Sequence, residues 1–137
     1  MSPEDLVPDR VYRRRADLHK HGLGGNWQKG ISYPATGTYV LLFSDPASEH
    51  VYGYRDSWLP GGRYRYYGEW DGTGDMTMTG GNAAIRDRSP ELHLFVAAPG
   101  GHRYAGRSAV ASVSTARATR DGREFKAIVF ELSPVDA

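Results

Sequence analysis

Two long strand patterns near the C-terminus are joined by Arg-Asp-Gly, a combination typical of a tight turn. The first pattern covers residues 103–119 and the second covers residues 123–133. Together they predict a long antiparallel hairpin. Residues 36–44 and 91–99 are also rich in β-branched, aromatic and aliphatic residues, and each predicts a further strand. These patterns indicate a chain dominated by β-strands.

The helical content is expected to be small. Residues 82–88 favour a helix, but Gly80 and Gly81 directly before them oppose it by about 1 kcal/mol each. We therefore expect an α+β fold that is mainly β, a twisted sheet or partly closed barrel with one or two short helices. Residues 1–9, rich in proline and acidic residues, are expected to be an N-terminal arm, and residues 10–137 fit a single domain.

The composition excludes several classes of protein. The chain of 137 residues has no cysteine, which rules out disulfides and thiolate metal sites. No apolar run approaches the ~18 residues of a membrane span. The first ten residues also lack the basic and apolar pattern of a secretion signal. We expect a cytoplasmic protein that does not interact with a membrane.

The net charge is only +1, but the basic residues are concentrated in two basic segments, residues 10–29 and 103–126. If the fold brings these segments together, they could form one surface that faces DNA phosphates. The alternative is that they are solvated faces of strands. The candidate backbone contacts are Arg13, Arg14, Arg15, Lys20, Lys29, Arg103 and Arg107.

No arrangement of residues in the sequence indicates catalysis. There is no Gly-x-Ser-x-Gly nucleophile motif, and the "GTGD" stretch at residues 72–75 is not followed by a Walker lysine. His19 and His21 resemble half of a metal site, but no partner cluster follows them. We expect no metal, no cofactor and no cleavage of DNA by this chain alone.

Aromatic residues are concentrated in residues 52–70, where seven of the chain's tyrosines and tryptophans lie beside arginines. Aromatic faces mixed with arginine are suited to stacking on nucleic-acid bases. The alternative is an aromatic cluster that covers one face of the sheet.

Several motifs in order resemble the SRA (SET- and RING-associated) domain family, whose members recognise modified cytosine in DNA. The resemblance extends from about Asp9 to Leu132. It is carried by "VYRRRADLHKHGLGGNWQKGIS", "TGTYVLLF", "YGYRDSWLPGGRYRYYG", "GDMTMTGGNAAI", "LHLFVA" and "HRYAGRSAV". A tyrosine followed twelve residues later by a second tyrosine, a polar residue and a glycine is similar to the family's base pocket. Here these residues are Tyr54, Tyr66, Tyr67 and Gly68.

The resemblance implies that the domain flips a modified cytosine, expected to be 5-methylcytosine, out of duplex DNA. Tyr54 and Tyr66 would stack on the flipped base, Tyr67 would border its 5-substituent, and Gly68 would allow a close approach of the backbone. Asp56 or Ser57 would bind the edge of the base. The helix after the pocket would support it through Asp75, Thr79 and Asn82.

The sequence departs from the family pattern at three positions. Ser57 stands where the family usually has aspartate, with Asp56 one residue earlier, while Tyr67 replaces threonine and Ala105 replaces aspartate. Bacterial relatives are often joined to an HNH nuclease domain in enzymes that restrict modified DNA, so the chain is expected to be the DNA-recognition part of such an enzyme. The alternative is a PUA-like β-barrel that binds RNA or a small molecule.

Overall fold

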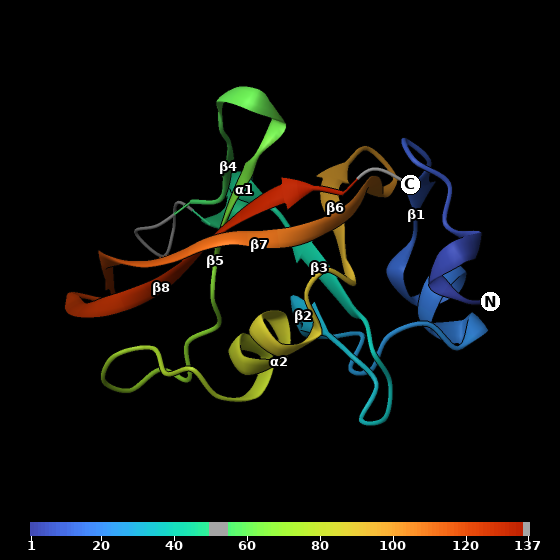
Figure 1. Cartoon of the computed structure of the whole chain (residues 1–137). Coiled ribbons are helices and arrows are strands. Elements are labelled where there is room, and N and C mark those ends of the chain that lie inside the picture. The colour runs from blue at the N-terminus through green and yellow to red at the C-terminus, as the bar shows by residue number, and fades with distance from the viewer. Residues whose placement is uncertain (50–54, 136–137) are drawn as a thin grey trace.

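The described part of the chain, residues 1–49 and 55–135 of a computed structural model, forms one twisted sheet with short helices on it (Figure 1). The α-helices are α1 (Pro46–Glu49) and α2 (Gly80–Arg88). Other helical turns cover Pro3–Asp5, Arg14–Leu18, His19–His21 and Pro60–Gly62. The strands are β1 (Val11–Tyr12), β2 (Ile31–Ser32), β3 (Val40–Ser44), β4 (Ser57–Trp58), β5 (Tyr64–Tyr67), β6 (Leu92–Ala98), β7 (Gly101–Arg120) and β8 (Arg123–Pro134).

The strand order is β2-β3-β6-β7-β8-β5-β4, and β1 pairs with β7 beside this path. β3 and β6 are parallel, while the other pairs are antiparallel. Within residues 1–49 and 55–135 no pairing joins β2 to β4, so the sheet is open. The predicted mainly β fold with short helices is thus confirmed as a twisted open sheet, and the expectation of a partly closed barrel is corrected.

The long C-terminal hairpin is formed by β7 and β8, as predicted. Its register runs to Arg120 opposite Arg123, which leaves Asp121 and Gly122 as a two-residue loop. Both loop residues have positive φ, 52° and 76°. Asp-Gly is a preferred pair where both turn residues need positive φ, and this explains why the chain reverses here.

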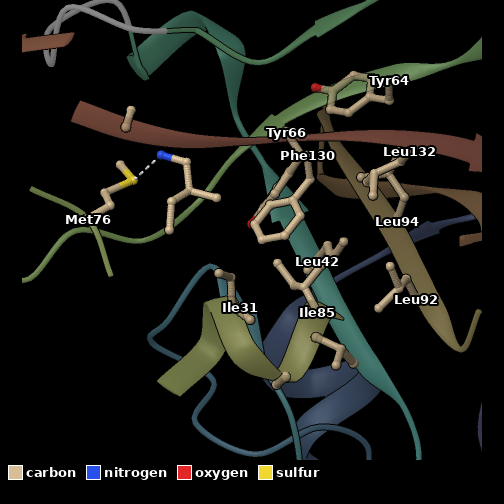
Figure 2. Close-up of a cluster of buried hydrophobic side chains, with 14 of the residues drawn as sticks. Ile31, Leu42, Tyr64, Tyr66, Met76, Ile85, Leu92, Leu94, Phe130 and Leu132 are labelled. Carbon is tan, nitrogen blue, oxygen red and sulfur yellow. Dashed lines mark hydrogen bonds between the residues drawn. The ribbon is translucent and has the colours of Figure 1, made fainter. Parts of the chain in front are cut away.

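The main hydrophobic core lies between α2 and the sheet (Figure 2). Ile85 of α2 packs there with Leu42 of β3, Leu94 of β6 and Phe130 of β8. Such a core is expected when one face of a sheet is covered by a helix. A second core contains Leu6, Tyr12, Leu18, Leu23, Leu41, Phe43, Phe95 and Tyr104.

The two glycines that argued against a helix lie at the start of α2. Gly80 has a φ of +55°, and a Cβ on Gly81 would lie 2.6 Å from Oε1 of Glu69 and 2.9 Å from a methyl carbon of Ile31. Glycine at position 81 therefore lets the first turn of the helix lie close to the segment after β5.

The N-terminal segment packs on the sheet next to β1. Leu6 is buried in the second core, and the backbone N–H of Val7 donates to the hydroxyl of Tyr12 at 2.8 Å. Among the described residues, no helix is long and apolar enough to span a membrane.

Candidate nucleic-acid interface

A surface hollow lies where the end of β5 meets β2 and β3, and we call it the β5 hollow. Its volume of about 440 Å³ lies within the range of small-molecule sites, roughly 300–1,000 Å³. The lining includes aromatic, charged and glycine residues. They are Lys29, Gly30, Ile31, Phe43, Asp56, Tyr66, Tyr67, Gly68, Glu69 and Trp70.

Four of the six predicted pocket residues line the β5 hollow: Asp56, Tyr66, Tyr67 and Gly68. Tyr54 lies outside the described residues. Ser57 belongs to edge strand β4, where it pairs with Arg65. The sequence left the choice between Asp56 and Ser57 open, and the structure places the carboxylate of Asp56, not the hydroxyl of Ser57, at the hollow.

Asp56 is a buried carboxylate with defined partners. Asp56 is only 2% exposed. Oδ1 accepts a hydrogen bond from the backbone N–H of Tyr67 at 2.8 Å, and Oδ2 accepts one from the hydroxyl of Ser44 at 2.6 Å. Donors of this kind stabilise a charged carboxylate away from bulk water.

Tyr66 is both a lining residue and a core residue. It is 3% exposed and belongs to the main core, opposite Phe130 of β8. The single proton of its hydroxyl is shared between the carbonyl oxygens of Gly30 at 3.4 Å and Phe43 at 3.3 Å. Figure 2 shows its ring between β3 and β8. The Tyr66 ring must therefore become more exposed to solvent before a base can stack on it.

Asn82 connects the first turn of α2 to the segment that follows β5. Its Oδ1 accepts from the backbone N–H of Glu69 at 2.8 Å, and its Nδ2 donates to the carbonyls of Glu69 at 3.0 Å and Thr77 at 2.9 Å. A Cβ on Gly68 would lie 2.6 Å from Oδ1 of Asn82. Gly68 and Asn82 thus fit one another closely at the rim of the β5 hollow.

The other two predicted support residues lie beside a neighbouring hollow of about 180 Å³, which shares Lys29, Glu69 and Trp70 with the β5 hollow. Asp75 accepts a hydrogen bond from the backbone N–H of Lys126 at 2.7 Å. Thr79 precedes α2, and its carbonyl accepts from the N–H groups of Asn82 and Ala83. Asp75 thus ties the middle of the segment between β5 and α2 to β8, and Thr79 ties the end of that segment to α2.

Arg14 is anchored on two residues that line the hollow, Phe43 and Lys29. Its guanidinium lies 3.8 Å from the centre of the Phe43 ring and donates through Nη2 to the carbonyl of Lys29. Burial lowers the pKa of this guanidinium from its usual value. Its Nε is buried and has no hydrogen-bond partner within the described residues. The basic segment is thereby held against the hollow.

The flanking arginines are exposed. Arg13 forms an ion pair with Asp17 at 3.1 Å, and the Arg15 guanidinium lies 5.0 Å from the Trp27 ring. Lys20 and Lys29 are exposed as well. These cations can therefore reach a ligand in solvent, which Arg14 cannot do without leaving Phe43.

The pairing of β1 with β7 brings the two basic segments together. Val11 is opposite Arg103, and both are exposed on the same face. Arg107 lies further along β7 and forms an ion pair with Glu91 at 2.7 Å. The fold thus joins the start of the first basic segment to the start of the second.

Comparison with known proteins identifies the family. A sequence model of the family described as "ScoMcrA-like, SRA domain" matches residues 8–137. The chain is a member of this SRA family. The resemblance noted in the sequence is thereby confirmed. No curated protein matches the chain.

Solved structures are similar to this SRA domain over nearly all of its length. The SUVH5 SRA domain in complex with methylated CHH DNA has a TM-score of 0.74 at 16% identity, covering 100% of this chain and 93% of that one. The sulfur-binding and SRA domains of ScoMcrA complexed with phosphorothioated DNA give 0.73 at 18% identity, covering 96% and 40%. The DNA modification-dependent restriction endonuclease AspBHI gives 0.66 at 17%, covering 97% and 43%. This chain thus spans less than half of either of the last two.

Sequence reasoning missed several residues of the SRA domain's hollow. Phe43 and Trp70 line it, and Ser44 contacts Asp56 behind it. Trp70 stacks on Phe125 of β8 with ring centroids 4.0 Å apart and an interplanar angle of 6°. The only sequence signal for Trp70 was its place in the aromatic segment, because its partner lies 55 positions away. Within residues 1–49 and 55–135, no group of three histidine or acidic side chains could hold a metal ion.

Proposed function

We propose that this SRA domain binds duplex DNA that contains 5-methylcytosine and accepts the flipped base in the β5 hollow. The observation that carries the proposal is the buried carboxylate of Asp56, which lines the hollow together with Tyr66 and Tyr67. A carboxylate accepts a hydrogen bond from the exocyclic amine of cytosine, whereas thymine presents an oxygen at that position.

The aromatic lining supplies part of the energy that base flipping requires. Extrusion of a base costs a few kcal/mol of stacking and pairing. Stacking of a base on an aromatic side chain returns about 1–3 kcal/mol. We propose that Tyr66 supplies one such face and Tyr54 the other, and that Tyr67 borders the 5-substituent. Gly68, braced by Asn82, allows the backbone to lie close to the base.

The similar proteins differ in the modified DNA that their descriptions name, methylated in one and phosphorothioated in another. Cytosine with a 5-methyl group suits the β5 hollow for two reasons. The Asp56 carboxylate would select cytosine, and the other lining residues would contact the 5-methyl group. We further propose that residues 10–137 are one DNA-recognition domain with residues 1–9 as its arm. It would serve a modification-dependent restriction endonuclease whose HNH or other nuclease domain is separate, so the pure chain should not cleave DNA.

The proposal is tested by titrating the chain with matched duplexes that contain cytosine or 5-methylcytosine at one position, with an RNA duplex as a control. Preferred binding of the methylated DNA is expected. A fluorescent base analogue at that position should brighten on binding, because flipping removes it from the stack. If the analogue stays quenched while binding depends on the modification, recognition occurs in the groove and the flipping mechanism is wrong.

Binding should weaken steeply with salt. Seven basic residues were proposed as backbone contacts, and Arg14 is anchored on Phe43, which leaves about six for phosphates. Six phosphate contacts correspond to a slope of about −5 in a plot of log K against log salt concentration. Fluorescence anisotropy between 50 and 300 mM salt, roughly a sixfold range, measures this slope. A flat response would contradict the proposed backbone surface.

Arg14 and Arg15 provide a matched pair of neighbouring substitutions. Arg15→Ala should weaken binding to all duplexes alike and reduce the salt slope by about 1, because an exposed cation contacts phosphate and not base. Arg14→Ala should instead lower the melting temperature, because it removes a guanidinium packed on Phe43 and bonded to the carbonyl of Lys29. We therefore propose different roles for two arginines that the sequence interpretation placed together as phosphate contacts. Equal melting temperatures of the two variants would contradict the structural role of Arg14.

A further inference from the structure

The carboxylate of Asp56 is the end of a chain of buried hydrogen bonds. Ser44, the last residue of β3, lies 2.6 Å from Oδ2 of Asp56 and 2.6 Å from the hydroxyl of Tyr64. Ser44 is 0% exposed and Tyr64 is 1% exposed. None of these three groups can exchange its partners for water without a local opening of the structure.

The chemistry of the groups determines which group donates and which accepts in each of these hydrogen bonds. A serine hydroxyl has one proton, and an ionised carboxylate only accepts. Ser44 therefore donates to Asp56, and Tyr64 donates to Ser44. The distance of 2.6 Å between Ser44 and Asp56 lies in the range of a charge-assisted O–H···O⁻ bond, about 2.5–2.7 Å. Oδ1 is held independently by the N–H of Tyr67.

The donors come from strands that are themselves fixed in the sheet. Tyr64 begins β5, where it pairs with Leu132 of β8 and with Trp58 of β4. The Trp58 ring packs edge-on against Tyr64, with centroids 4.7 Å apart. Ser44 is paired with Val96 across the parallel β3–β6 ladder. The Tyr64 hydroxyl can therefore move little relative to Ser44.

We propose that Tyr64 and Ser44 are positioning residues that set the cytosine selectivity of the β5 hollow by holding the Asp56 carboxylate in one orientation. The inference rests on the proposed function, because it concerns the edge of the base that enters the hollow. A fixed carboxylate accepts from the amine of cytosine and repels the O4 oxygen of thymine. A carboxylate that can turn away loses both effects.

Thymine provides a matched test ligand, because it carries the same 5-methyl group as 5-methylcytosine. Binding is measured on duplexes that differ only in 5-methylcytosine or thymine opposite guanine at one site. In Ser44→Ala we expect about tenfold weaker binding of the methylcytosine duplex, equivalent to 1.4 kcal/mol, with thymine binding unchanged or stronger. The selectivity ratio should therefore fall by about tenfold or more, while the salt slope stays at its wild-type value.

Tyr64→Phe tests the same series of hydrogen bonds without removing a ring from the core. We expect a smaller fall in the selectivity ratio, about threefold. Ser44→Ala leaves the Tyr64 hydroxyl without this acceptor, so the double variant Ser44→Ala/Tyr64→Phe should recover stability and keep the low ratio. A purely structural role would weaken binding of both duplexes equally. If Ser44→Ala does not fold, Tyr64→Phe decides the question.

The outcomes separate this inference from the proposed function. If the wild-type chain prefers methylated DNA but the variants keep the wild-type selectivity ratio, the positioning role is wrong and the proposed function stands. If the wild-type chain does not prefer methylated over plain DNA, the proposed function fails and the inference fails with it.

Discussion

Tyr66→Ala is expected to lower the free energy of unfolding by about 3–5 kcal/mol, the usual range for removing a large aromatic side chain from a core. Tyr66 is buried in the main core, and its hydroxyl proton is shared between two backbone carbonyls. Urea unfolding followed by tryptophan fluorescence measures the loss. A change below about 1 kcal/mol would show that the ring does not pack as the structure describes.

Two control variants separate the roles of Tyr66. Tyr66→Phe keeps the ring and should cost only about 1 kcal/mol, the usual net value of a hydrogen bond. Tyr66→Leu keeps much of the core volume but removes the aromatic face, so its main effect should be the loss of about 1–3 kcal/mol of stacking in binding to methylated DNA. The sequence interpretation treated a pocket tyrosine and a core tyrosine as alternatives, whereas Tyr66 lines the β5 hollow from within the core.

Asn82→Ala should lower the free energy of unfolding by about 2–4 kcal/mol, because a buried group left without its partner costs about 1–3 kcal/mol. Three backbone groups lose their partner: the N–H and carbonyl of Glu69 and the carbonyl of Thr77. Asn82 is 1% exposed, so water cannot replace the amide without a rearrangement. Thermal unfolding measures the loss, and hydrogen exchange at the Glu69 amide should accelerate more than exchange at the β7–β8 ladder.

Asn82→Asp is the matched control for this substitution. It keeps an acceptor for the N–H of Glu69 but places an oxygen against the carbonyls of Glu69 and Thr77. We therefore expect it to be no more stable than Asn82→Ala at neutral pH. An aspartate variant as stable as wild type would show that the donor bonds of Asn82 contribute little and that the brace is wrongly described.

The sequence alone was sufficient to predict a structural feature that depends on residues adjacent in the chain. Asp121 and Gly122 adopt the positive φ that their residue types favour, so the hairpin was predictable from them. The pocket that the spacing of Tyr54 and Tyr66 predicts stays a prediction, because Tyr54 lies outside the described residues. The helix at α2 was harder to predict, because its glycines are explained only by the contacts of Gly81 with Glu69 and Ile31.

Other parts of the site depend on residues that are distant in the sequence. Arg14 was predicted as a phosphate contact, but the Phe43 ring beneath it lies 29 positions away. Asp56 was one of two candidates, and its selection depends on Ser44 and on the backbone of Tyr67. Such contacts follow from the register of the sheet, which the alternation of residue types along one strand does not determine.

The open sheet has a consequence for how this domain can exist within a longer protein or beside its own copies. An exposed edge strand offers unpaired backbone groups to any neighbouring chain, and long flat edges promote aggregation. The terminal strands of this sheet, Ile31–Ser32 and Ser57–Trp58, are two residues long each. Edges this short present few backbone groups in a row, so strand addition by another copy gains little. These two ends of the sheet therefore offer little to a neighbouring copy, and the longer edge is that of β7 beyond Ser108, which among the described strands pairs only with β8.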